Sequence, residues 1–126
     1  MGANRRFQRV QSLTREVKIL HAKVNIGASG APTLVSDDSV GVTSITRDSA
    51  GVYDLVLDDK YVSLAHMNIS LEAASAEDLT FQIESDTISS NKTVRFQCKA
   101  AAVETDPSNG AVLRIRLELK NTSVAR

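Results

Sequence analysis

A strict two-residue alternation near the C-terminus constrains the fold more than any other feature of this chain. Four aliphatic residues alternate there with four charged residues: Leu113, Ile115, Leu117 and Leu119 against Arg114, Arg116, Glu118 and Lys120. Successive side chains of a β-strand point to opposite faces, so the pattern predicts a strand at residues 111–121 with one buried face and one solvated face. Such a strand requires a sheet and a cover for its apolar face.

Shorter apolar runs between turn-forming residues predict more strands. We expect them at residues 16–26, 33–35, 40–47, 52–57, 67–73, 79–84 and 93–101. In the third of these, Val40, Val42, Ser44 and Thr46 are expected on one face, and residues 61–64 are expected to form one helical turn.

Two turn signals separate these strands most clearly. Residues 48–51 favour a hairpin turn, because Gly51 can adopt a positive φ. Residues 105–110, which contain Asp106, Pro107 and Gly110, form the strongest turn signal in the chain.

Strands at short, turn-marked intervals without a long helix between them favour an antiparallel all-β fold. We expect a compact sandwich or small barrel of about eight strands, preceded by an extended basic N-terminal arm. Residues 1–23 would form this arm and the start of the first strand, and residues 24–126 a single β domain. The arm could also be helical, because Phe7, Val10 and Leu13 fall at helical spacing.

Charge is distributed unevenly along a chain whose net charge is zero. Residues 1–23 carry a net charge of +5, and residues 24–126 carry −5. This asymmetry is typical of a basic arm on an acidic body, and it favours docking of the arm on an acidic protein surface. The side chains expected to make this contact are Arg5, Arg6, Phe7, Arg9, Val10 and Arg15.

No group of residues predicts catalysis or metal binding. Cys98 is the only cysteine, which excludes an intrachain disulfide, and it lies in a strand-like run where a small core residue is expected. Asp37-Asp38 and Asp58-Asp59 are paired carboxylates without EF-hand spacing, so we interpret them as turn residues. We therefore expect no enzyme activity, no metal and no cofactor.

Other ligand classes are also disfavoured. Two histidines, His21 and His66, and one cysteine are too few ligands for a tetrahedral zinc site. Gly27–Gly30 is not a P-loop, because no Lys-Ser/Thr pair follows it. Phe7 is the only aromatic residue in the basic arm. Single-stranded nucleic acid is usually bound by several aromatic side chains that stack on the bases, so the sequence argues against nucleic-acid binding. No apolar run is long enough for a membrane span, so we expect neither a membrane nor a small-molecule partner.

Residues 25–126 resemble a family of small structural proteins of tailed-bacteriophage virions. The similarity lies in turn and strand motifs: Ile45-Thr46-Arg47, Gly51-Val52-Tyr53, Asp59-Lys60-Tyr61, Asp106-Pro107, Gly110-Ala111 and Asn121-Thr122-Ser123-Val124. The resemblance implies a non-enzymatic virion component made in the host cytoplasm. It does not distinguish head from tail.

A small β domain with a basic arm suits a capsid decoration, or cement, protein on the outer capsid surface. By analogy with such proteins we expect a homotrimer that binds the major capsid protein, with Tyr53 and Tyr61 as inter-subunit anchors. Three alternatives remain open: a tail, baseplate or neck module, a carbohydrate-binding domain, and an enzyme. The absence of Trp disfavours the carbohydrate-binding alternative.

Overall fold

The computed structural model describes residues 17–120 of the chain. These residues form nine strands: β1 (Val17–Ile26), β2 (Pro32–Leu34), β3 (Val42–Ser49), β4 (Val52–Leu57), β5 (Ser63–Glu72), β6 (Thr80–Asp86), β7 (Thr93–Ala100), β8 (Val103–Glu104) and β9 (Val112–Lys120). Two short 3₁₀ turns, η1 (Ala28–Gly30) and η2 (Ser36–Asp38), lie between the first three strands.

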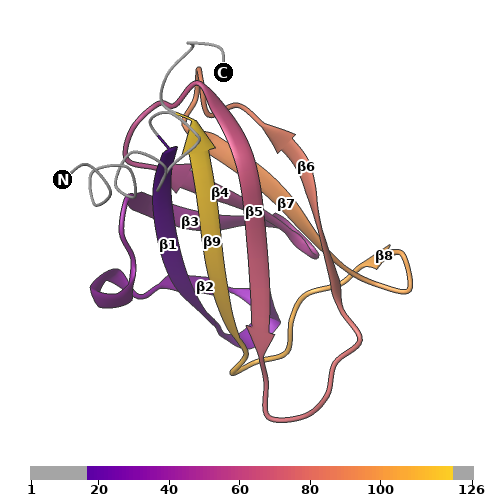
Figure 1. Cartoon of the computed structure of the whole chain (residues 1–126). Helices are drawn as coiled ribbons and strands as arrows, with labels where there is room; N and C mark the ends of the chain where they lie inside the picture. The colour runs from indigo at the N-terminus through magenta and orange to yellow at the C-terminus, as the bar shows by residue number, and fades with distance from the viewer. Residues whose placement is uncertain (1–16, 121–126) are drawn as a thin grey trace, which may run out of the picture.

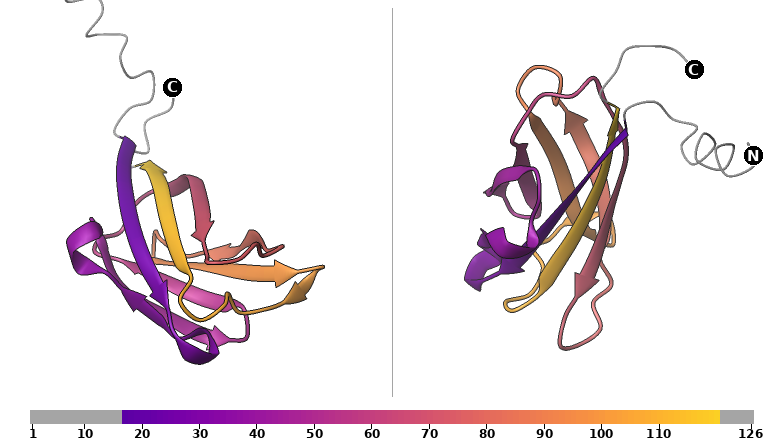
Figure 2. Two further views of the ribbon diagram at one scale, coloured as in Figure 1. Left: turned by 90° about the horizontal axis from the view of Figure 1, so that it is seen from below. Right: turned by 60° about the vertical axis from the view of Figure 1, so that its left-hand side comes forward.

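The strands form two antiparallel sheets that pack face to face as a sandwich (Figure 1). Sheet A has the order β2-β1-β9-β5, and sheet B has the order β3-β4-β7-β6, with β8 paired to β7. Figure 2 shows that the strands of the two layers cross obliquely. The expected all-β sandwich is confirmed, and the two separate sheets exclude a closed barrel.

The core lies between β1 and β9 on one side and β4 and β7 on the other. Its largest fully buried side chains are Tyr53, Phe96, Leu55, Leu57, Ile88, Leu113, Leu117 and Leu119. The rings of Tyr53 and Phe96 stack at 5.6 Å between centroids. The alternation of β9 is confirmed, because its aliphatic residues face this core.

On one side of the sandwich, the segment between β2 and β3 passes from sheet A to sheet B and covers the core. The backbones of His21 in β1 and Val40 exchange two hydrogen bonds, of 3.3 and 2.8 Å, just before the chain enters β3 of the other sheet. Gly41, at φ +78°, makes this corner against Leu20. On the opposite side, β5 and β6 are the edge strands of their sheets.

Two local predictions were wrong, and one short strand was missed. Register shifts in β3, one of them between Val42 and Ser44, place Val42 and Ile45 in the core, so the expected face of Val40, Val42, Ser44 and Thr46 does not form. Residues 61–64 form no helical turn, because β5 begins at Ser63. The two-residue strand β8 was not predicted, since a strand this short carries no periodic signal.

Substitution of Gly51 tests the packing of the predicted hairpin turn. Its φ is +72°, and a Cβ atom there would lie 2.5 Å from the carbonyl oxygen of Cys98 and 2.6 Å from the amide nitrogen of Thr105. Gly51→Ala should therefore lower the free energy of unfolding by more than about 2 kcal/mol, because backbone strain adds to a clash with fixed backbone atoms.

Gly110 is the matched control, since its φ is +91° but a Cβ atom would meet nothing within 4 Å. Gly110→Ala should cost only about 1–2 kcal/mol from backbone strain. Equal losses for the two variants in urea unfolding would contradict the packing assigned to Gly51.

Candidate functional site

The carboxylate of Asp106 ties the turn before β9 to the β3–β4 hairpin, which lies more than fifty residues earlier in the sequence. Arg47, in β3, donates two hydrogen bonds to it, from Nε at 3.0 Å and from Nη2 at 2.8 Å. The backbone N–H of Gly51 donates a third at 2.8 Å. The Arg47 guanidinium holds the pKa of Asp106 below its usual value. We call the group Arg47, Gly51, Tyr53 and Asp106 the Asp106 clamp.

Tyr53 connects the clamp to a third segment, η1. Its hydroxyl donates to the carbonyl oxygen of Gly30 at 2.9 Å and lies 3.3 Å from the Asp106 carboxylate. Burial and the nearby Asp106 charge raise the pKa of Tyr53 well above its ordinary value, so the hydroxyl stays protonated. Arg47, Gly51, Tyr53 and Asp106, which come from three of the six quoted sequence motifs, thus meet in one hydrogen-bonded network. That network fixes the relative positions of the hairpin, the turn before β9 and η1.

The expectation that Tyr53 anchors a subunit interface was wrong. Its side chain is fully buried (0% exposed), because its ring stacks in the core and its hydroxyl donates a hydrogen bond to the carbonyl oxygen of Gly30. Tyr61 is half-buried against the same core, where burial raises its pKa. Its role at an interface remains a prediction. Arg5, Arg6, Phe7, Arg9, Val10 and Arg15 lie outside the described residues.

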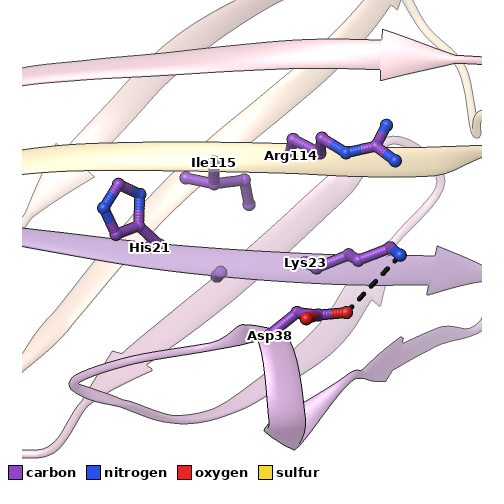
Figure 3. Close-up of a pocket in the computed structure, with 6 residues that line it drawn as sticks. His21, Lys23, Asp38, Arg114 and Ile115 are labelled. Carbon is purple, nitrogen blue, oxygen red and sulfur yellow. Dashed lines mark ion pairs between the residues drawn. The ribbon is translucent and has the colours of Figure 1, made fainter.

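A hollow of about 380 Å³ lies on the outer side of sheet A beside η2 (Figure 3). His21, Lys23, Arg114 and Asp38 line it, together with Ala22 and Ile115. Lys23 forms an ion pair with Asp38 at 3.5 Å, and Arg114 forms one with Glu72. The cations are therefore partly neutralised by neighbours, and the hollow is a weak candidate for an anion site.

Two further hollows, of about 290 and 500 Å³, lie between the edge strands β5 and β6. We call this surface the β5–β6 mouth. Its apolar lining is Met67, Ile69, Leu71, Leu79, Phe81 and Ile83. Five of these residues are only half-buried, and Ile83 is 41% exposed. The core therefore continues to the surface here, on the side opposite the crossing at Gly41.

The segment that forms much of the mouth is acidic. Residues 72–86 contain five carboxylates and no basic residue: Glu72, Glu77, Asp78, Glu84 and Asp86. Glu72 and Glu84 pair with Arg114 and Arg95 on the outer faces of the sheets, and Glu77 lines the larger hollow. Glu77 accepts a hydrogen bond from the Ser108 hydroxyl at 2.6 Å, whereas Asp78 and Asp86 are exposed. Sequence reasoning did not predict this site, although the uninterrupted acidic run was a usable signal for it.

The cysteine and the paired aspartates considered as site residues lie in the core or in turns. Cys98 is fully buried, as predicted, and burial raises the pKa of its thiol to about 12. Asp37 and Asp38 lie in η2, and Asp58 follows β4, where it accepts a hydrogen bond from Thr43. Residues 17–120 hold no cluster of three or more His, Cys, Asp or Glu side chains that could bind a metal ion.

Within the described part of the chain, no helix has the length and apolar character needed to cross a membrane. Comparison of the chain with protein-family models, with curated proteins and with solved structures finds no match.

Asp106→Asn tests the clamp by removing the charge while keeping the size of the side chain. We expect the free energy of unfolding at pH 7 to fall by about 1.5–3 kcal/mol, the range for hydrogen bonds to a charged group. The folded-state pKa of Asp106 is lowered from 3.8, so this contribution is present above pH 3.8 and is lost as the pH falls through the lowered pKa.

Urea unfolding between pH 2 and 7 measures both effects. Asp37→Asn, at an exposed turn carboxylate, is the control and should change the stability by less than about 0.5 kcal/mol. A loss for Asp106→Asn that stays constant down to pH 2 would refute the proposed charge interaction.

Cys98 should be unreactive in the native protein. Its buried thiol and a pKa near 12 leave little thiolate at pH 8. Labelling by a thiol reagent at pH 8 should be at least about a thousandfold slower in buffer than in urea, where the ordinary pKa is restored. Rapid labelling in buffer would show that β7 opens readily.

Proposed function

We propose that this chain is a non-enzymatic structural protein of a tailed-bacteriophage virion, namely a capsid decoration protein that binds the outer capsid lattice and stabilises the head. The observation that carries the proposal is the Asp106 clamp. Arg47, Gly51, Tyr53 and Asp106 come from three motifs that resemble the phage family, and they contact one another in the fold. A resemblance between residues that form one network is more specific than scattered matches.

Charge and shape support the same proposal. The body has a covered core with a half-exposed apolar mouth at one edge, and a basic segment precedes it. Such a protein can bind a lattice through many modest contacts, because multivalent attachment turns weak single contacts into a stable shell. Assembly as a homotrimer on the major capsid protein is part of the proposal.

A tail, baseplate or neck module is the second candidate. The free edges of β5 and β6 favour it as much as a capsid position, because rings of β domains are held together by such edges. Binding to purified tails but not to capsids would select this candidate.

Deletion of residues 1–15 tests the capsid proposal. We expect the full chain to co-sediment with capsids that lack it, and the deleted chain to bind at least about tenfold more weakly, because four arginines and their acidic contacts are removed. Quantitative co-sedimentation at low and high salt gives the binding constants.

Two substituted full-length chains separate the effect of the arm's charge on capsid binding from the effect of its length. The change of Arg5, Arg6, Arg9 and Arg15 to Lys keeps the charge and should retain most binding, whereas their change to Gln should weaken it like the deletion. Unchanged binding after the deletion would refute the role of the arm. No capsid binding by the full chain would refute the decoration proposal itself.

A further inference from the structure

The β5–β6 mouth has the features of an unfilled docking site. Among residues 17–120, β5 pairs only with β9, and β6 pairs only with β7, so each has an outer edge with free backbone donors and acceptors. Between these edges lie the half-exposed side chains of Met67, Ile69 and Phe81, with the more exposed Ile83. Exposed strand edges beside an apolar surface are typical acceptors for a further segment of chain.

The charge of the acidic segment restricts what can bind at the mouth. Two mouths cannot pair symmetrically without bringing Glu77, Asp78 and Asp86 of both copies together, and nucleic acid would be repelled by the same carboxylates. The occupant therefore requires basic side chains for these carboxylates and large apolar side chains for the lining. Asp78 lies between the lining residues Glu77 and Leu79, Asp86 is the last residue of β6, and both side chains are exposed.

A second acidic surface is less suitable. On the outer face of sheet B, Asp54 accepts two hydrogen bonds from Arg95 at 2.8 and 2.9 Å, and Asp48 lies 3.3 Å from the same guanidinium. This interaction lowers the pKa of Asp54. Its carboxylates already have a cation, and no comparable apolar hollow accompanies them.

One segment of this chain has the required chemistry. Residues 1–15 contain four arginines and no acidic residue, and beyond Met1 they contain three large apolar residues, Phe7, Val10 and Leu13. We propose that this arm of a neighbouring copy binds in the β5–β6 mouth, with its apolar side chains on the lining and its arginines beside the acidic segment.

Strand order explains why the arm comes from a neighbour. The arm precedes Val17, which pairs with Lys120 of β9, while the mouth lies beyond β5 on the other side of β9. Within one copy, the chain would have to cross three strand spacings, about 14 Å, at the end of sheet A. This crossing would consume about five residues and withdraw Leu13 and Arg15 from the mouth. A neighbour's arm keeps all of its contacts.

The inference rests on the proposed function in one respect, because it takes the arm to be the assembly element. Donation of an arm from each copy to the next is a heterologous contact, and it closes into a ring if the rotation between copies allows. A trimer is the smallest ring that fits the proposed decoration protein.

Cysteine cross-linking of the full chain tests the contact directly. In Val10→Cys/Ile83→Cys, mild oxidation should give dimers and larger species that separate on reduction. The control is Val10→Cys/Ile19→Cys, because Ile19 is 45% exposed, similar to Ile83, but lies on β1 away from the mouth. Equal cross-linking of the two variants, or a bond only within monomers, would overturn the proposal.

Charge reversal gives a second, independent measurement. Sedimentation equilibrium should show that the full chain associates, more weakly at high salt, and that Asp78→Lys/Asp86→Lys weakens association by about tenfold or more. Asp37→Lys/Asp59→Lys makes the same charge change at exposed turns and should have little effect. A full chain that is monomeric at high concentration would also overturn the proposal.

Both measurements use the purified chain without capsids, so they separate the two proposals. Association through the mouth without capsid binding would refute only the decoration function. Capsid binding by a chain that does not associate would refute only the contact between arm and mouth.

Discussion

The carboxylate of Asp106 holds the two sheets and their turns in one arrangement. It accepts hydrogen bonds from Arg47 and from the backbone of Gly51, and it lies beside the buried hydroxyl of Tyr53, which in turn fixes Gly30. The turn before β9 is thereby tied to the β3–β4 hairpin and to η1. Because Tyr53 also stacks on Phe96, a polar contact at the surface is coupled to the centre of the core. Loss of the carboxylate would remove the partner of Arg47 and of the Gly51 N–H, whereas Tyr53 would keep its hydrogen bond to Gly30.

The two sides of the sandwich are covered to different extents. The chain crosses between the sheets at Gly41 and covers the core there, whereas β5 and β6 end their sheets with half-exposed aliphatic side chains. The same molecule therefore has a closed side and an open one. The open side carries acidic residues, and the segment of opposite charge lies at the N-terminus of the chain. An assembly in which one copy covers the open side of the next accounts for both features.

Much of the fold could be predicted from the sequence, because alternation is a local signal. The strands at β7 and β9 and the glycine turn at Gly51 follow directly from it. Tyr53 could not be placed, because its burial depends on Gly30, which lies 23 residues away in the sequence. The register shifts of β3 depend on its pairing with β4, and the hollows of the mouth depend on how the two sheets meet, so neither has a periodic signal in the sequence. The basic N-terminal segment stood out by its charge, whereas the acidic segment was overlooked because its five carboxylates are spread over fifteen residues.

The most direct test is to image phage particles that contain this chain at a resolution that traces its backbone. The account predicts β sandwiches on the outer capsid surface, each with the N-terminal arm of a neighbouring copy between β5 and β6. Sandwiches on the capsid with an empty mouth would contradict the proposed contact between copies. Density confined to the tail or neck would contradict the decoration function.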